Sequence, residues 1–271
     1  MSSSGRKAGD GPNAKGVTKP TDAPPGERLY TSAPIIDAII ELRFGDELSD
    51  ADREKVAKKF ASEYPIAQEV VHRGINVSVN EDVIGTTMQV EQRITKRTSS
   101  ETADVIQIGS RILNVGTGAP YDGWDRLFAR FVKNWAVAKR VWGFRPIERI
   151  GVRFINRLDL PPNAKGTVDY EDYLNLRINL PKEFPDIFLY NLRFQSPLDE
   201  IRSVANILSG TVPDAVPGKA SFLLDIDVFR DEDVPQKDAD VLAYLEQVRA
   251  CKNSLFETFI TDMARELFDA D

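Results

Sequence analysis

The chain has 271 residues, enough for one large domain or two small ones, and its net charge is −7 at pH 7. Hydrophobic residues make up 42% and charged residues 28%, which is the composition of an ordinary globular protein. The negative net charge argues against general nucleic-acid binding, because such binding depends largely on Lys and Arg side chains that neutralise phosphates.

Single copies of cysteine and histidine, Cys251 and His72, limit the chemistry further. One cysteine excludes a disulfide framework within the chain, and one histidine leaves little room for a zinc site or a His-dependent nucleophile. The sequence has no apolar run of about eighteen residues and no apolar N-terminal segment, so we expect neither a transmembrane helix nor a secretory signal. These features predict a cytoplasmic protein that does not enter membranes.

Residues 1–29 differ from the rest of the chain in composition. They are rich in Gly, Pro, Ser and Lys and contain no aromatic residue. Such a segment buries too little apolar surface to offset the entropy lost on folding. We therefore expect a disordered tail, followed by an ordered body that begins near Tyr30.

The ordered body is expected to begin with a strand and a helix. Apolar residues occupy every second position of residues 33–44 (APIIDAIIELRF), which predicts a strand with one buried face. Residues 48–64 have apolar side chains at helical spacing, and Ser49 or Asp50 can cap that helix. Three strands are expected next, in residues 68–79, 86–97 and 104–115, followed by a helix over residues 121–142.

A second series of elements follows Gly143. The pattern predicts a strand over residues 147–160, a short helix over 169–176, strands over 187–196, 201–210 and 220–229, and a long final helix over 238–268.

The order strand, helix, three strands, helix thus occurs twice, which indicates an internal duplication. We predict an α+β fold of two similar halves, residues 30–143 and 144–271, that pack together as one unit. Strands joined by short turns favour antiparallel pairing, so antiparallel sheets should pack on the amphipathic helices.

Four segments carry a resemblance to a known family. They are APIIDAIIELRF (33–44), PYDGWDRL (120–127), IERIGVRFINRLDLP (147–161) and LFETFITDMARELF (255–268). Their order and the chain length resemble a sporadically distributed bacterial family of uncharacterised proteins of about 250–270 residues. The resemblance implies no particular activity, and the patchy distribution implies a link to mobile or defence genes.

Arginines recur on the polar faces of the expected strands. In GVRFINRLDL (151–160), Arg153, Arg157 and Asp159 share one face, while Arg43 and Arg193 lie on the polar faces of other strands. If these faces belong to one surface, Arg43, Arg153, Arg157 and Arg193 could bind an anion, because guanidinium groups contact phosphate or carboxylate at two points. They could equally form a solvated sheet face with cross-strand ion pairs.

Two carboxylates on one strand face, Asp225 and Asp227, are candidates for a metal site. Paired carboxylates at this spacing can hold Mg²⁺ or Mn²⁺ through their oxygens. Acidic residues can instead compensate the charge of nearby arginines. The sequence leaves both interpretations open.

The missing motifs favour a non-catalytic function. The sequence shows no nucleophile constellation, no metal-ligand cluster, no glycine-rich phosphate loop and no cofactor motif. We therefore expect a cytoplasmic binding or interaction protein that is linked to defence or toxin–antitoxin systems. Its expected partner is another protein, with a phosphorylated small molecule or a second copy of the chain as further options. The alternative is a metal-dependent hydrolase or nuclease-like enzyme that binds phosphate through the arginine-rich face.

Overall fold

The structure of the protein, a computed structural model, describes residues 28, 30–80, 83–181, 183–184, 189–213 and 216–269, with the backbone alone over 72–80 and 83–92. The expected tail falls almost entirely outside the described residues. Arg28 is the exception, because its guanidinium pairs with the Asp269 carboxylate at 2.5 Å.

Within the described residues, nine strands form one antiparallel sheet in the order β2-β3-β4-β5-β1-β6-β9-β8-β7. The strands are β1 (Ile35–Phe44), β2 (Ile66–Asn80), β3 (Val83–Thr98), β4 (Asp104–Gly109), β5 (Ile112–Gly118), β6 (Ile147–Leu160), β7 (Asn191–Leu198), β8 (Ser203–Thr211) and β9 (Ala220–Arg230). The predicted α+β class and antiparallel pairing are confirmed. The first strands of the two expected halves, β1 and β6, pair at the centre of a single sheet.

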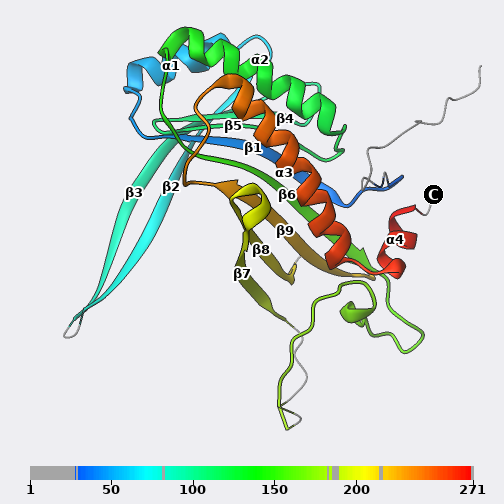
Figure 1. The fold of residues 1–271 in the computed structure, drawn as a ribbon. Helices are drawn as coiled ribbons and strands as arrows, with labels where there is room; N and C mark the ends of the chain where they lie inside the picture. The colour runs from blue at the N-terminus through cyan, green and yellow to red at the C-terminus, as the bar shows by residue number, and fades with distance from the viewer. Residues whose placement is uncertain are drawn as a thin grey trace, which may run out of the picture.

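The α-helices of the described chain lie on one face of this sheet (Figure 1). They are α1 (Asp50–Lys59), α2 (Trp124–Trp142), α3 (Asp238–Phe259) and α4 (Asp262–Asp269). Helix α2 packs on β5 and β1, and α3 packs on β9 and β6. The core between them is formed by the apolar side chains of alternate strand positions, such as Ile40, Leu42, Val152 and Phe154.

Local sequence signals explain where α1 and α2 begin. The hydroxyl of Ser49 accepts a hydrogen bond from the Asp52 amide at 3.1 Å, so Ser49 caps α1. Helix α2 starts after Gly123, whose φ of 102° is a conformation that favours glycine. Along α2, Trp124, Leu127, Phe131 and Trp135 face the core, as the apolar stripe predicted.

The expected strand over residues 104–115 is instead two strands. β4 and β5 are separated by a tight turn at Ser110 and Arg111. Backbone hydrogen bonds fix the turn, because Leu48 and Phe44 donate to the carbonyls of Ser110 and Arg111 at 2.8 Å each. The prediction of one continuous strand is therefore wrong, and Gly109-Ser110 is the turn signal that it passed over.

The long final helix is interrupted. Ile260 has an extended backbone (φ −108°, ψ 153°), which ends α3 before α4 begins. The loop around Leu174 contacts this break: the amides of Asn175 and Thr261 donate to the carbonyls of Phe259 and Tyr173 at 2.8 and 3.0 Å. A distant segment therefore supplies the hydrogen bonds that a continuous helix would have made itself. The short helix expected over residues 169–176 is reduced to the 3₁₀ turn Tyr170–Asp172.

The β2–β3 hairpin extends beyond the rest of the sheet (Figure 1). The two strands pair along their whole length, but only residues 94–98 of β3 pair with β4. His72 lies in this hairpin, at a position where only the backbone is described. A search of the described helices finds none long and apolar enough to cross a membrane.

Candidate functional site

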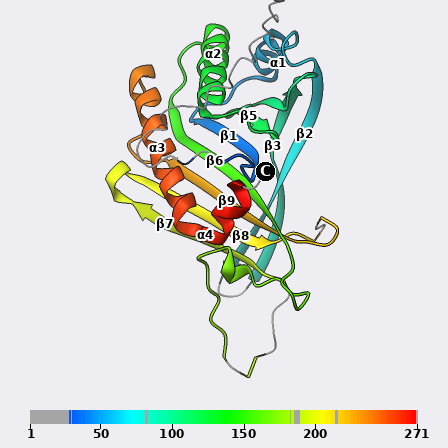
Figure 2. The same cartoon turned by 90° about the vertical axis from the view of Figure 1, so that its right-hand side faces the viewer.

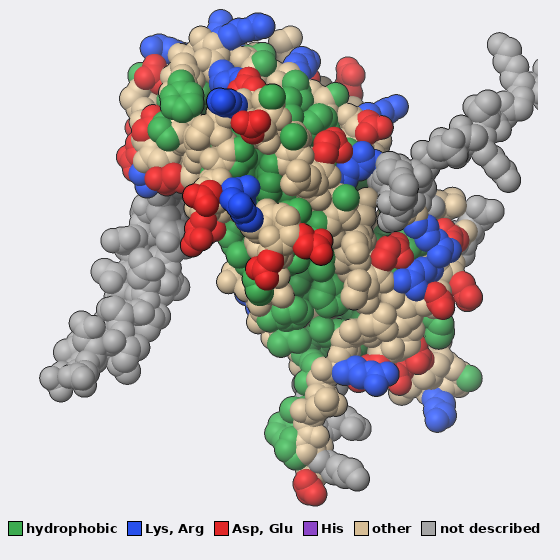
Figure 3. Space-filling view, in the orientation of Figure 1, with side chains coloured by type: hydrophobic (Ala, Val, Ile, Leu, Met, Phe, Trp, Pro, Cys, Tyr) green, Lys and Arg blue, Asp and Glu red, His purple; other side chains and the backbone are tan. Residues whose placement is uncertain are grey.

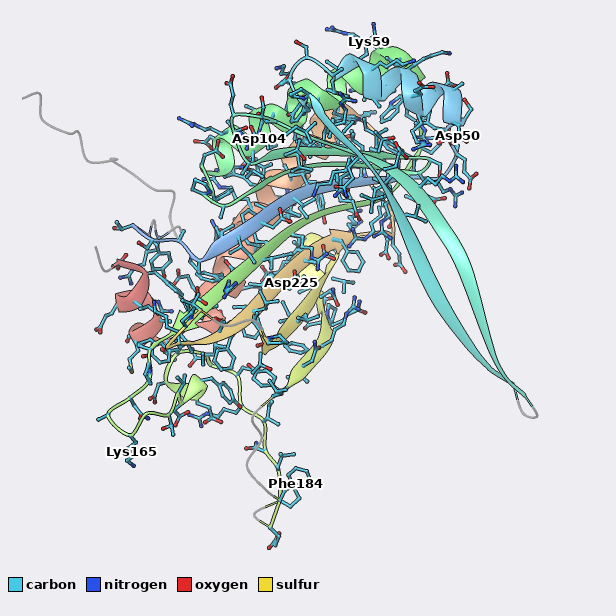
Figure 4. The ribbon with its side chains drawn as sticks, turned by 180° about the vertical axis from the view of Figure 1, so that it is seen from behind. Asp50, Lys59, Asp104, Lys165, Phe184 and Asp225 are labelled. Atoms are coloured by element: carbon cyan, nitrogen blue, oxygen red, sulfur yellow. The ribbon has the colours of Figure 1, made fainter. Side chains whose placement is uncertain are left out.

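The face of the sheet opposite the helices carries the charged residues that the sequence singled out (Figure 4). Because side chains alternate along each strand, β1, β6 and β9 direct the following residues to this face: Glu41, Arg43, Arg149, Arg153, Arg157, Asp159, Asp225 and Asp227. Arg193 lies on the same face near the sheet edge, where its Nε donates to Asn206 Oδ1 at 3.0 Å. The charged side chains that the sequence singled out therefore lie on one face of the sheet.

Arg43 and Arg153 both pair with carboxylates of this face. Arg43 Nε lies 2.8 Å from Glu41 Oε1. Arg153 makes a two-point contact with Asp225, from Nε to Oδ1 at 2.9 Å and from Nη2 to Oδ2 at 2.5 Å. These hydrogen bonds to Asp225 raise the pKa of Arg153. An anionic ligand that contacted either arginine would therefore lie next to a carboxylate of like charge.

Arg157 also pairs with a carboxylate of this face. Its Nε donates to Asp159 Oδ1 at 2.9 Å, and its Nη2 contacts Ser221 Oγ at 3.2 Å. Burial opposes the ionisation of Asp159, but hydrogen bonds from Ser221 and Arg157 lower its pKa. The negative charge of Asp159 therefore stays opposite Arg157.

The most enclosed ion pairs lie at the centre of the face. Arg149 binds both Glu41 and Asp227, with 2.8 Å between Arg149 Nη2 and Asp227 Oδ2, and all three side chains are at most 15% exposed. Burial, together with the charge of Glu41, raises the pKa of Asp227 even though Arg149 works against this shift. Asp227 and Asp225, the candidate metal ligands, thus face arginines. Among the described residues, no group of three or more His, Cys, Asp or Glu converges as a metal site would require.

A trough of about 670 Å³ runs along this charged face. Arg43, Arg149, Arg153 and Asp227 line it, whereas Arg157 and Arg193 lie outside it. Its lining contains four arginines (43, 111, 149 and 153) and four carboxylates (41, 47, 148 and 227). This balance gives the trough no excess of positive charge with which to attract an anion.

A second cavity, of about 300 Å³, opens on the helix side of the sheet. It lies where the start of β1, the start of α2 and the C-terminal half of α3 meet β6, at the end of the molecule turned to the viewer in Figure 2. We call it the aromatic pocket, because five aromatic side chains line it: Tyr30, Tyr121, Trp124, Phe154 and Phe256. Cavities of this size and lining commonly bind small molecules.

A few polar groups project among these rings. Lys252 on α3 is 8% exposed, and its ammonium lies 3.7 Å from the centre of the Phe154 ring. Asn156 on β6 is 2% exposed and donates from Nδ2 to the Leu224 carbonyl at 2.9 Å. An apolar wall with few fixed polar groups is suited to orient a ligand.

The acidic side chains at the rim are directed to arginines. Arg130 contacts both carboxylate oxygens of Asp122, at 3.0 and 3.2 Å. Burial opposes the ionisation of Asp122, but these contacts lower its pKa. Glu257 accepts hydrogen bonds from Tyr30 at 2.5 Å and from Arg265 at 2.8 Å. Burial and the contact with Glu257 raise the pKa of Tyr30, so this hydroxyl stays protonated.

All four segments that carry the family resemblance contribute to the aromatic pocket. Ile35, Tyr121, Phe154 and Phe256 each come from a different one of them, and all four line the cavity. Sequence reasoning assigned Phe154 to the core, placed the other three on no buried face, and did not predict a cavity. One feature of the sequence could have indicated a cavity. Lys252 is a charged residue on an apolar helical stripe, four residues after Val248 and four before Phe256.

The single cysteine offers no reactive thiol. Cys251 is half-buried on α3, and burial raises the pKa of its thiol. A thiol with a raised pKa is a weak nucleophile at neutral pH.

A scan against known protein families and a search of curated proteins found no match to this chain.

Proposed function

We propose that this protein is a non-catalytic binding protein that holds a small ligand in the aromatic pocket. The observation that carries the proposal is the cavity of about 300 Å³, lined by five aromatic side chains around a nearly buried lysine. The rings of this open cavity expose apolar surface to water, and a ligand with a planar apolar body would bury that surface.

The alternative, an enzyme that binds phosphate through the arginine-rich sheet face, has less support. Arg43, Arg153 and Arg157 each contact a carboxylate at 2.9 Å or less. Replacing such pairs by a phosphate would leave carboxylates next to an anion of like charge. A cytoplasmic location and a role in bacterial defence or toxin–antitoxin systems remain part of the proposal and rest on the sequence and the resemblance.

We also propose that the fold arose by internal duplication. Outward from the central pair, the sheet order β1-β5-β4-β3 corresponds to β6-β9-β8-β7, and the helices α2 and α3 directly follow β5 and β9. Strand β2 and helix α1 have no counterpart in the described second half. This correspondence supports two related halves, residues 30–143 and 144–271, packed as one unit.

Binding of a neutral aromatic dye tests the pocket directly. N-phenyl-1-naphthylamine becomes fluorescent in apolar surroundings, and we expect saturable binding at one site per chain. Ala33 is exposed and lines the pocket, so Ala33→Trp is expected to fill the opening without disturbing the core. Its affinity for the dye should fall by roughly tenfold or more, a loss of about 1.4 kcal/mol.

Ala61→Trp is the matched control, because Ala61 is exposed and lies beyond α1, outside the pocket lining. This variant should bind the dye as the wild type does. Absence of saturable binding to the wild type, or an equal loss in both variants, would contradict the proposed pocket.

A second observation favours association of two copies of the chain. Phe194 on β7 and Phe259 on α3 are both half-buried, with 6.2 Å between their ring centroids, and we call this pair of rings the apolar band. Figure 3 shows hydrophobic side chains gathered on the face of the molecule beside α3. Among the described residues, strand β7 is an edge of the sheet with one charged residue, Arg193. Pro197 removes a backbone donor near its end, so the stretch before Pro197 is the part that can pair with another edge. We propose a homodimer in which two β7 edges pair and their apolar bands meet.

Phe259→Glu should dissociate this dimer. A carboxylate in the band would lose its hydration on association, so sedimentation velocity should show a monomer whose circular dichroism is native. Met263→Glu is the control, because Met263 is 47% exposed on α4 and should leave the dimer intact. A wild type that sediments as a monomer would contradict the dimer.

A further inference from the structure

Asn156 brings a fixed hydrogen-bond acceptor to the aromatic pocket. The residue lines the cavity from β6 and is 2% exposed. Its Nδ2 donates to the carbonyls of Leu224 at 2.9 Å and of Phe154 at 3.5 Å. Because a carbonyl oxygen can only accept, the nitrogen end of the carboxamide faces these two groups, and Oδ1 is the end that remains.

This Oδ1 atom is available to a ligand. No group of the described residues donates a hydrogen bond to Asn156 Oδ1. A ligand that fills the cavity displaces water from this acceptor, and an acceptor that loses water without gaining a donor costs free energy. A ligand therefore binds best when it supplies an N–H or O–H group in exchange.

The charged side chains of the lining are engaged within the protein. Asp122 and Glu257 accept hydrogen bonds from arginines, and Arg28 pairs with a carboxylate of α4. Arg249 and Lys252 likewise have interactions of their own. The uncharged polar groups are therefore left to select a ligand.

Asn253 is the second carboxamide of the lining. It lies on the stripe of α3 that faces the cavity, four residues after Arg249 and three before Phe256. Asn253 is only half-buried, so water reaches its amide, and exchange of that water for a ligand group changes the free energy little. Asn156, which is nearly buried, is the group that discriminates between ligands.

The rings beside Asn156 determine the shape of the ligand. Tyr121 and Phe154 meet edge to face with 5.5 Å between their centroids, and packed rings of this kind form a rigid wall. Phe154 precedes Asn156 by two residues on the same buried face of β6, so wall and acceptor are about 7 Å apart along the strand. A flat aromatic body against this wall fits with little loss of entropy and has its edge near the acceptor.

We infer that the aromatic pocket selects an uncharged planar aromatic molecule with an N–H or O–H donor at its edge, such as an indole or a phenol, whose donor binds Asn156 Oδ1. This inference rests on the proposed function and adds the hydrogen-bonding chemistry of the ligand to it.

Three ligands of similar shape test the inference. Indole carries an N–H group, 1-benzofuran has an ether oxygen in its place, and 1-methylindole has a methyl group on the nitrogen. Each ligand is titrated into the full-length wild type with bound N-phenyl-1-naphthylamine. Indole should displace the dye at a roughly tenfold lower concentration than the other two, the size expected for one hydrogen bond to a nearly buried acceptor. Burial alone would favour 1-benzofuran, because an N–H group loses its hydration in the cavity.

Asn156→Leu should abolish the preference for indole, because Leu has a similar size and no acceptor. Its affinity for 1-benzofuran should stay within about threefold of the wild-type value. Asn253→Leu is the matched control, because it removes the other carboxamide from the same lining and should keep the preference. Ala33→Trp should weaken all three ligands, which places them at the pocket.

The outcomes separate the inference from the proposed function. If the dye binds but the wild type does not prefer indole, or if Asn156→Leu keeps the preference, the inference is wrong while the pocket stands. The same holds if Asn253→Leu removes the preference. If neither the dye nor the three ligands bind the wild type, both proposals fail. Circular dichroism identifies a variant that does not fold, and if Asn156→Leu is one, the wild-type order of the ligands and its retention in Asn253→Leu decide.

Discussion

Replacing Arg149 by Met should destabilise the protein by about 3–5 kcal/mol at pH 7, the usual cost of removing one partner from a buried ion pair. Arg149 stands between Glu41 and Asp227, and none of the three side chains is more than 15% exposed. The guanidinium of Arg149 also lies over the Phe229 ring, with 4.1 Å from Cζ to the ring centre, so Met removes this contact together with both ion pairs while keeping a similar apolar stem. Urea unfolding of the variant and the wild type at pH 7 measures this difference in the free energy of unfolding.

The same variant should recover stability in acid. Burial already raises the pKa of Asp227, and removal of Arg149, which works against that shift, should raise it further. A carboxyl whose pKa is higher in the folded state than in the unfolded state binds its proton more tightly when folded. The deficit of Arg149→Met relative to the wild type should therefore shrink as the pH falls from 7 to about 5.

Arg43→Met is the control for Arg149→Met, because both arginines pair with the carboxylate of Glu41. Arg43 also pairs with Glu41, at 2.8 Å, but its side chain is 54% exposed. We expect a loss of at most about 1 kcal/mol, because exposed pairs contribute little. Equal losses for Arg43→Met and Arg149→Met, or a deficit that does not change with pH, would show that the central ion pairs are solvated.

Replacing Trp135 by Ala should cost about 3–5 kcal/mol, the range for removal of a buried aromatic side chain. Trp135 is 5% exposed on α2, and its ring stacks on Phe131 with 5.6 Å between centroids. Phe154→Ala should have an effect of similar size, because Phe154 is 1% exposed at the centre of the sheet. The midpoint of urea unfolding should fall for both variants with little change in slope.

Phe144→Ala is the control for Trp135→Ala. Phe144 follows α2 by two residues and is 72% exposed, so its removal should change stability by less than about 0.5 kcal/mol. A near-native midpoint for Trp135→Ala would mean that α2 does not pack on the sheet through this face.

Local patterns in the sequence determined the elements and their buried faces. The alternation in residues 33–44 and 147–160 predicted β1 and β6 and most of their core-facing side chains, because side-chain direction in a regular strand depends only on position. Ile36 is the exception: it was expected on the buried face, but it is 38% exposed beside a register shift between Ile35 and Asp37. The apolar stripe of α2 and the cap at Ser49 were also predictable from local sequence, because both depend on the spacing of residues within one helix.

Elements that depend on distant partners were predicted less well. The continuous final helix was wrong because backbone groups near Leu174, about 85 positions away in the chain, stabilise the break at Ile260. The turn between β4 and β5 was missed although Gly109 and Ser110 give a short turn signal. Hydrogen bonds from the distant amides of Phe44 and Leu48 also define it, and no local pattern shows these.

The sequence by itself determined that charged residues share the polar faces of strands, and it left open whether arginines such as Arg153 were free to bind a ligand. Only the tertiary structure decided their partners, because Arg153 and Asp225 are 72 positions apart and meet through strand pairing. The aromatic pocket was likewise beyond the sequence. A cavity is the space that packed segments fail to fill, and no local pattern encodes the fit of β1, α2, β6 and α3 around it.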